Sequence, residues 1–140
     1  MLSPSKVFGT RFSHTLISDG CIIHADSITN ALIGIRSRIG PRTIIQDAII
    51  LGNDYYQSLK DITEESQTKL LGIGKNSYIK NAIIDKNVKI GNFVSIVGDD
   101  SLEDVETDSY CIRDGIVILK KGAVIPDKTQ IGMPNLEMHL

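Results

Sequence analysis

The sequence of 140 residues predicts an all-β protein, and three of its features support this fold class. It contains 23 isoleucines, three phenylalanines and no tryptophan, a composition that favours strands packed through β-branched side chains over helices. Aliphatic residues recur six positions apart along most of the chain. Glycine often follows the recurring aliphatic residue, as in Ile33-Gly34, Ile73-Gly74 and Ile131-Gly132. A period of six matches neither an amphipathic helix nor a simple alternating strand.

The six-residue period is typical of a parallel β-helix built from hexapeptide repeats. Each unit would form one short strand and a corner, with the aliphatic side chain inward and the glycine where the backbone bends. Three units would close one triangular coil, and coils would stack through backbone hydrogen bonds about 4.8 Å apart. We expect about four coils. The inward residues would be Ile22, Ile28, Ile33, Ile39, Ile45, Leu51, Ile73, Ile79, Ile84, Ile90, Ile96, Leu119, Ile125 and Ile131.

The period also predicts how the chain is divided. Residues 1–12 lack it and are predicted to be an incoming linker, residues 13–132 are predicted to form the β-helix, and residues 133–140 a C-terminal tail. Two interruptions, near residues 53–72 and 99–111, predict excursions from the coils. The first is polar and could hold a short helical turn. The second carries six acidic residues between Asp99 and Asp108 and is interpreted as a solvated loop.

Composition excludes several classes of function. Fifteen lysines and arginines against 17 acidic residues give a formal net charge of −2 and a pI near 5.9, which argues against nucleic-acid binding. No apolar run approaches the roughly 20 residues of a membrane span, and the N-terminal residues hold no apolar segment of signal-peptide type. Cys21 and Cys111 are interpreted as reduced packing residues, and a cytoplasmic or stromal location is expected.

The sequence offers no catalytic constellation and no metal site. Its histidines are His14, His24 and His139. A hexapeptide acyltransferase needs a histidine as general base, and a carbonic anhydrase on a β-helix needs three histidines on zinc. Neither spacing is present, so His24 is interpreted as a side chain on the coil surface.

Two groups of cations stand out on this acidic chain: Lys80, Lys86 and Lys89, and then Arg113, Lys120 and Lys121. Residues a whole number of coils apart share one face of a β-helix, so lysines distant in sequence can converge on one anion. Ordinary solvated lysines are the alternative interpretation.

Six segments form an ordered set: Leu2-Ser3-Pro4-Ser5-Lys6, Ile33-Gly34-Ile35-Arg36-Ser37-Arg38, Leu51-Gly52-Asn53-Asp54-Tyr55-Tyr56, Gly72-Ile73-Gly74-Lys75-Asn76, Ala82-Ile83-Ile84-Asp85-Lys86-Asn87 and Gly115-Ile116-Val117. In this order they resemble the C-terminal domain of ADP-glucose pyrophosphorylases, also called glucose-1-phosphate adenylyltransferases, of the cyanobacterial and plant type. The resemblance runs from about residue 2 to residue 131.

The resemblance implies a left-handed β-helix, a handedness that the repeat itself does not fix. Enzymes of this family make ADP-glucose and pyrophosphate from ATP and glucose 1-phosphate with Mg²⁺, for glycogen or starch synthesis. Their catalytic site lies in an N-terminal nucleotidyltransferase domain, whose glycine-rich nucleotide loop has no counterpart in this chain. By this resemblance the chain is the β-helix domain alone, holds no cofactor of its own and is predicted to be inactive by itself.

The same resemblance implies a role in regulation and oligomerisation. In the family this domain contributes to subunit contacts of a tetramer and to control by 3-phosphoglycerate and phosphate. The family's two effector lysines match Lys86, in the Ile-Ile-Asp-Lys-Asn segment, and Lys121, with Lys120 and Arg113 as further effector-binding candidates. Asp114 stands where the family has serine, and we expect its carboxylate to weaken anion binding nearby.

Two other functions stay open at this point. A ligand-free β-helix scaffold or interaction module needs no effector site. A hexapeptide-repeat acyltransferase would need a trimer with a histidine in the groove between subunits. Under the regulatory hypothesis the expected partners are the catalytic domain, other subunits of the tetramer and a small anionic effector, without nucleic acid or membrane.

Overall fold

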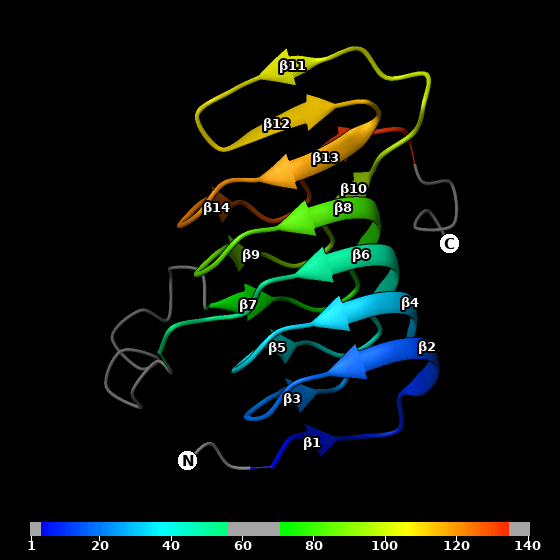
Figure 1. Ribbon diagram of the computed structural model, residues 1–140, viewed down its shortest axis with the longest axis vertical. Helices are drawn as coiled ribbons and strands as arrows, with labels where there is room; N and C mark the ends of the chain where they lie inside the picture. Colours follow the sequence, from blue (N-terminus) through cyan, green and yellow to red (C-terminus); the bar gives the residue numbers. More distant parts are fainter. Residues whose placement is uncertain (1–3, 56–70, 135–140) are drawn as a thin grey trace.

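The computed structural model describes residues 4–55 and 71–134, and the regular elements within them are all β-strands. Figure 1 shows these strands stacked as rungs along the long axis, with the N-terminus at one end. Neighbouring coils pair in parallel, which confirms the predicted all-β, parallel β-helix. The strands are β1 (Lys6–Val7), β2 (Arg11–Ile17), β3 (Ile22–Ile23), β4 (Ser27–Ile33), β5 (Arg38–Ile39), β6 (Ile44–Ile50), β7 (Gly72–Ile73), β8 (Tyr78–Ile84), β9 (Lys89–Ile90), β10 (Ser95–Val97), β11 (Val105–Glu106), β12 (Tyr110–Arg113), β13 (Ile116–Leu119), β14 (Val124–Ile125) and β15 (Gln130–Gly132).

These strands form the three faces of a prism. The first face is the six-stranded sheet β1-β3-β5-β7-β9-β14. Strands β2, β4, β6 and β8 each bend midway, so one half lies on the second face and the other half on the third. Strands β10 and β15 continue the second face, and β13 continues the third. The bends occur at residues that tolerate a left-handed backbone: His14 (φ 49°), Asn30 (φ 50°), Asp47 (φ 50°) and Asn81 (φ 52°).

The core consists of aliphatic columns that run along the inside of each face. On the second face Ile28, Ile45, Ile79, Ile96 and Ile131 pair in register, and each is at most 4% exposed. Identical side chains on consecutive rungs bury one another, so no coil has a core without its neighbours.

The predicted inward series is confirmed except at two positions. Ile22 and Leu51 point outward, with 40% and 39% of their surface exposed, and Ile23 and Ile50 fill those core positions. The cause is the length of the coil. Ile28 pairs with Ile45, a step of 17 residues, which is one fewer than three full hexads. The missing residue moves the inward position from Leu51 to Ile50.

Small residues fill the corners, where coils approach closely. A Cβ atom on Gly40 would lie 2.7 Å from the carbonyl carbon of Gly74 in the next coil, so only glycine fits there. The buried Ser77 hydroxyl donates a hydrogen bond to the Gly91 carbonyl at 3.3 Å. Buried corner hydroxyls of this kind satisfy backbone groups that would otherwise lack a partner.

Strand pairing begins earlier than the expected linker boundary. β1 pairs with β3, with Lys6 opposite Ile22, and β2 starts at Arg11, so both have residues within 1–12. These strands add rungs, and the first face therefore has six of them, more than the coil number expected. Of the expected tail, the structure describes Met133, whose amide donates to the Val97 carbonyl at 2.9 Å, and Pro134.

The first excursion leaves the prism beyond Asn53. Asn53 itself belongs to the coil, since it is 5% exposed and its amide donates to the Ile35 carbonyl at 2.9 Å. The chain is back in the coil at Leu71, directly before β7. Residues 56–70, with the expected helical turn, lie outside the described residues.

The second excursion is a β-structure and not the solvated loop that the sequence predicted. Between β10 and β13, strands β11 and β12 pair with each other in antiparallel fashion, and β12 pairs with β13. Figure 1 shows these strands above β13 at the end of the prism. The physical reason is the edge of the third face: β13 is its last parallel rung, and β12 pairs with the backbone groups that this edge would expose.

The thiols of Cys21 and Cys111 are both free, and Cys21 is buried with its Sγ donating to the Gly34 carbonyl at 3.2 Å. Residues 4–55 and 71–134 contain no helix with the length and hydropathy needed to cross a bilayer.

Replacing Ile45 by alanine should lower the free energy of unfolding by about 2–5 kcal/mol, because it opens a cavity in a fully buried column. The control is Ile49→Ala on the outward side of β6, where 41% of the side chain is exposed and the loss should stay below about 1 kcal/mol. Urea denaturation followed by circular dichroism measures both values. Equal losses would contradict the inward and outward alternation of β6.

Ser95→Ala should leave stability unchanged or raise it, because the buried Ser95 Oγ has no hydrogen-bond partner among the described residues. Ser77→Ala should instead cost about 1–3 kcal/mol, since it leaves the buried Gly91 carbonyl without this donor. Differential scanning calorimetry compares the two variants. A loss at Ser95 as large as that at Ser77 would reveal a partner for the Ser95 hydroxyl.

Candidate functional site

Two of the predicted effector lysines lie on neighbouring rungs at one corner of the prism. Ile84 at the end of β8 pairs with Leu119 at the end of β13, and both point inward. Lys86 and Lys121 follow two residues later and stay in step, since the Gly122 amide donates to the Lys86 carbonyl at 3.0 Å. Neighbouring rungs are about 4.8 Å apart, so the two lysines start from stacked backbone positions.

The local sequence explains why both lysines sit at a bend. The residue after each lysine adopts a left-handed backbone, with φ 61° at Asn87 and φ 75° at Gly122. Asparagine and glycine tolerate this conformation better than other residues. The chain therefore turns from the third face to the first directly beyond each lysine, and the side chains of Lys86 and Lys121 project from the edge.

An aspartate from the rung below completes this corner. The Asp54 carboxylate lies 3.2 Å from the Lys86 Nζ, and it accepts a hydrogen bond of 3.0 Å from the Asn87 side-chain amide. The Asp54 backbone amide donates to Asn87 Oδ1 at 2.9 Å, so Asn87 binds Asp54 at two points. We call Asp54, Asp85, Lys86, Asn87 and Lys121 the lysine corner.

The residue before Asp54 fixes where the carboxylate lies. Besides its backbone bond to the coil below, the buried Asn53 side chain donates to the Arg36 carbonyl at 2.8 Å, and the Arg36 guanidinium donates to the Asn53 carbonyl at 3.3 Å. Asp54 is therefore held from both sides, by Asn53 through the chain and by Asn87 through hydrogen bonds. A carboxylate fixed in this way loses less freedom when it forms an ion pair than one on a mobile loop.

The surroundings of Asp54 favour its charged form. The hydrogen bond from Asn87, the hydrogen bond and charge of Lys86 and the more distant charge of Lys121 hold the pKa of Asp54 below its usual value. Both lysines thus act on the same carboxylate. The side chains of Lys86 and Asp54 are 45% and 43% exposed, so solvent screens the pair and it contributes little to stability.

Lys120 and Arg113 turn away from the lysine corner. The Lys120 Nζ donates to the Thr107 carbonyl at 2.6 Å and lies 3.4 Å from a Glu106 carboxylate oxygen. Arg113 lies 3.5 Å from the other carboxylate oxygen of Glu106, and its guanidinium also donates to the Val105 carbonyl at 3.0 Å. Of the four predicted effector residues, the structure therefore brings Lys86 and Lys121 together and places Lys120 and Arg113 around Glu106.

The expectation for Asp114 is wrong. Asp114 precedes β13 and Lys121 follows it, so a strand of about 3.3 Å rise per residue separates them by roughly 20 Å. The Asp114 amide instead donates to an Asp104 carboxylate oxygen at 3.2 Å, in the second excursion. The carboxylate beside the lysines is that of Asp54.

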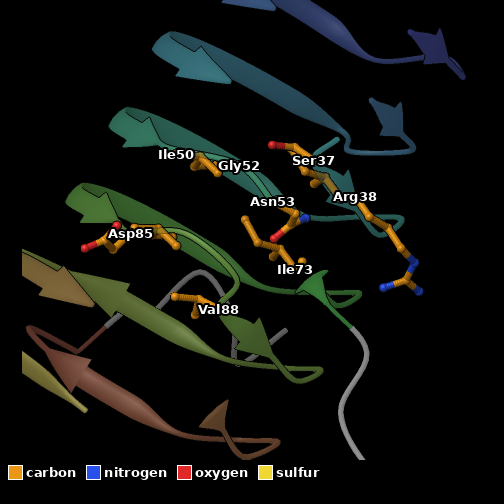
Figure 2. Close-up of a pocket in the computed structure, with 11 residues that line it drawn as sticks. Ser37, Arg38, Ile50, Gly52, Asn53, Ile73, Asp85 and Val88 are labelled. Atoms are coloured by element: carbon orange, nitrogen blue, oxygen red, sulfur yellow. The ribbon is translucent and has the colours of Figure 1, made fainter. Parts of the chain in front are cut away.

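A small pocket lies behind the lysine corner and does not provide a ligand cavity. Figure 2 shows its lining from three successive coils, with Ser37 and Asn53 on one side and Asp85 and Val88 on the other. Its volume is about 10 Å³, room for one water molecule. This volume is too small to hold a metabolite inside the prism.

The lysine corner carries groups that can form ion pairs and charge-assisted hydrogen bonds. It presents two ammonium groups, two carboxylates and one amide, and no nucleophile paired with a base. Within the described part of the chain no three histidine, cysteine or acidic side chains are grouped so that they could hold a metal ion. His24 is exposed and stacks on the Phe8 ring with centroids 4.3 Å apart, as a coil-surface residue would.

The sequence analysis gave no role to Asp54, although it lies in one of the six segments. The register across the first excursion decides which residue faces Lys86, and the period is absent there. The length of the coil was the signal in the sequence that could have located Asp54. With 17 residues per coil, Asn53 follows Arg36 by one coil, which places Asp54 at the same corner.

Two comparisons with known proteins agree with this architecture. Residues 1–130 match the model of the GLGC left-handed parallel beta-helix domain family, which also supplies the handedness. The small subunit of a chloroplastic/amyloplastic glucose-1-phosphate adenylyltransferase from Triticum aestivum is 41% identical over 134 residues. This alignment covers 93% of the chain but only 28% of the wheat protein, so the chain spans little more than a quarter of that relative.

The pKa of Asp54 should lie below the ordinary aspartate value of about 3.9 and rise toward it in Lys86→Met and in Asn87→Gly, which keeps the left-handed backbone. A depressed pKa means that the pair stabilises the fold fully above the ordinary value and loses this effect as pH falls through the depressed one. Carboxyl carbon NMR shifts measured against pH report it. An ordinary pKa in the unsubstituted chain would contradict the contacts described.

Proposed function

Because this chain belongs to the GLGC left-handed parallel beta-helix domain family, we propose that it is the regulatory and oligomerisation domain of a glucose-1-phosphate adenylyltransferase. Two findings support this proposal: the family match over residues 1–130 and the similarity to the wheat small subunit. The enzyme would convert ATP and glucose 1-phosphate to ADP-glucose and pyrophosphate, in glycogen or starch synthesis.

The stacking of Lys86 and Lys121 is the observation that carries the regulatory part. Two ammonium groups on adjacent rungs suit a small dianion such as phosphate or 3-phosphoglycerate, because each can form a charge-assisted hydrogen bond to a separate oxygen. The rungs fix the spacing of the two lysine backbones before a ligand arrives. Lys120 and Arg113 would contribute long-range charge, as both are engaged with Glu106.

Chemistry would take place elsewhere in the enzyme. We assign ATP, glucose 1-phosphate and Mg²⁺ to a catalytic part outside this chain, and we expect residues 1–140 alone to be inactive. The lysine corner would then act on catalysis only through contact between the two parts. For the location we infer the cytoplasm, or the plastid stroma in a plant, because the wheat relative is named as a chloroplastic/amyloplastic protein.

An apolar ladder on the third face is the surface best suited to such contact. Its outward positions pair rung by rung, and three of its residues are well exposed, Leu16 at 72% and Leu32 and Ile49 at 41% each. The ladder continues through Ile83 and Ile118, which are partly buried. Contiguous apolar side chains on a protein surface indicate a binding surface. We assign it to the catalytic part of the same polypeptide, since the wheat relative is far longer than this chain.

A ligand-free scaffold is the second candidate. One observation favours it: Lys86 already has a counter-ion in Asp54. Isothermal calorimetry with phosphate and 3-phosphoglycerate, on the domain joined to its catalytic part, separates the two functions. Heat of binding that disappears in Lys86→Ala supports the effector site, and no heat with either anion supports the scaffold.

Lys86→Ala and Lys121→Ala should each raise the activator concentration for half-maximal activity by about tenfold or more, because each loses a charge-assisted bond. The measurement is a 3-phosphoglycerate titration of an enzyme that carries this domain, for example joined to the wheat catalytic part. Lys6→Ala in β1, an exposed lysine at the other end of the prism, is the matched control and should leave the curve unchanged. Unchanged curves for both corner variants would remove them from the effector site.

Leu32→Ser together with Ile49→Ser should weaken assembly of the same enzyme, because both changes remove apolar area from the ladder. Light scattering after size-exclusion chromatography gives the mass of the assembly, and urea denaturation of the 140-residue chain checks its fold. We expect a lower assembly mass or a catalytic part more sensitive to protease, with the chain itself folded. An intact assembly with unchanged protease resistance would reject this surface.

A further inference from the structure

We propose that Asp54 is the resident anion of the lysine corner and sets its affinity, so that an effector must displace the Asp54 carboxylate from Lys86 in order to bind. This inference rests on the proposed function of Lys86 and Lys121 and concerns how tightly that site holds an anion. The ligand class is a small dianion with a phosphate group, as opposed to a monoanion such as acetate or chloride.

The first ground is that Asp54 is held in place. Asn87 binds it through its side-chain amide and its Oδ1, at 3.0 Å and 2.9 Å, and Asn53 anchors the preceding peptide in the coil. Most exposed ion pairs require two long side chains to lose their freedom. Here contacts that do not depend on Lys86 hold the carboxylate in place. It therefore loses little conformational freedom when it pairs with Lys86, and it competes strongly with any other anion for that lysine.

The second ground is the difference between the two lysines. Lys86 is 3.2 Å from the Asp54 carboxylate, whereas Lys121, which is exposed, makes no ion pair within residues 4–55 and 71–134. The corner therefore offers one unpaired ammonium group and one that is already satisfied. Asp85 adds a further carboxylate, whose oxygen accepts a hydrogen bond from the Lys86 backbone amide at 2.7 Å.

The effect on affinity follows from counting the contacts that are exchanged. A monoanion that takes the place of Asp54 on Lys86 replaces one ionic contact by another and gains nothing. A dianion with several oxygens can reach Lys86 and Lys121 together, so it gains two contacts for the one it displaces. The charge of Asp54 also repels every anion at the corner, and it repels a dianion more than a monoanion. Asp54 thus lowers the affinity of the corner for all anions.

Asp54→Asn is the variant that isolates this effect. Asparagine has the size of aspartate and keeps an oxygen that can accept from Asn87, while it removes the charge that pairs with Lys86. The matched control is Asp26→Asn, since Asp26 forms an exposed ion pair with Arg11 at 3.3 Å near the N-terminal end. Both variants change the net charge equally, so a difference between them is local.

The experiment is an NMR titration of the ¹⁵N-labelled 140-residue chain with sodium phosphate and then with sodium acetate, at constant low ionic strength. The amides of Lys86, Asn87 and Gly122 report binding at the corner. In Asp54→Asn we expect a phosphate dissociation constant about three- to tenfold lower than in the unsubstituted chain, from the loss of an exposed pair and its repulsion. Acetate should gain by a smaller factor, because its single charge is repelled less by Asp54 than the two charges of a phosphate dianion. Asp26→Asn should change neither value.

Two outcomes overturn the inference. One is an unchanged phosphate constant in Asp54→Asn, and the other is the absence of phosphate-dependent shifts at these amides in that variant. Neither decides the proposed function, which stands or falls with the activation curves of Lys86→Ala and Lys121→Ala. If the Asp54→Asn spectrum shows an altered fold, Asp54→Ser, which also lacks the charge, takes its place with the same expectations.

Discussion

The register of the backbone hydrogen bonds between coils is the constraint on which the rest of the structure depends. Each rung pairs in register with the rung below, so inward isoleucines lie above one another, as in the column from Ile28 to Ile131. Burial of this column supplies the stability, because no single coil has a core of its own. The same register sets the positions of the outward side chains, so residues that are far apart in sequence become neighbours on the surface.

The candidate site results from this register between coils at one corner of the prism. Lys86 and Lys121 are separated in sequence by the second excursion, yet they stack because Ile84 and Leu119 pair in the strands before them. Asp54 joins them because the first excursion also begins at this corner, directly beyond the buried Asn53. The excursions lengthen the sequence between rungs without changing the register. A rigid prism can therefore hold charged groups at fixed spacing without a cavity.

The sequence predicted the core residues of this protein better than the contacts on its surface. Isoleucine recurrence located the core because burial acts on every rung, and it failed at Ile22 and Leu51 only where a coil is one residue short. The second excursion was mistaken for a solvated loop because its acidic residues indicate exposure to solvent. Strand β12 forms because it pairs with the edge strand β13, and this pairing is not visible in the local sequence. The stacking of Lys86 on Lys121 was expected from the resemblance and the repeat. Asp54 was missed, and Asp114 was misplaced, because contacts across excursions follow from register and not from spacing.

A disulfide cross-link between Lys86→Cys and Lys121→Cys, in a chain with Cys21 and Cys111 replaced by alanine, tests the stacked corner most directly. Backbone positions on adjacent rungs about 4.8 Å apart lie within the Cα separation of disulfides, so mild oxidation should join the two cysteines. Peptide mapping by mass spectrometry identifies the link, and the pair Lys86→Cys with Arg113→Cys should not form one. Failure of the first pair to cross-link in a folded chain, or equal cross-linking of both pairs, would contradict the shared corner.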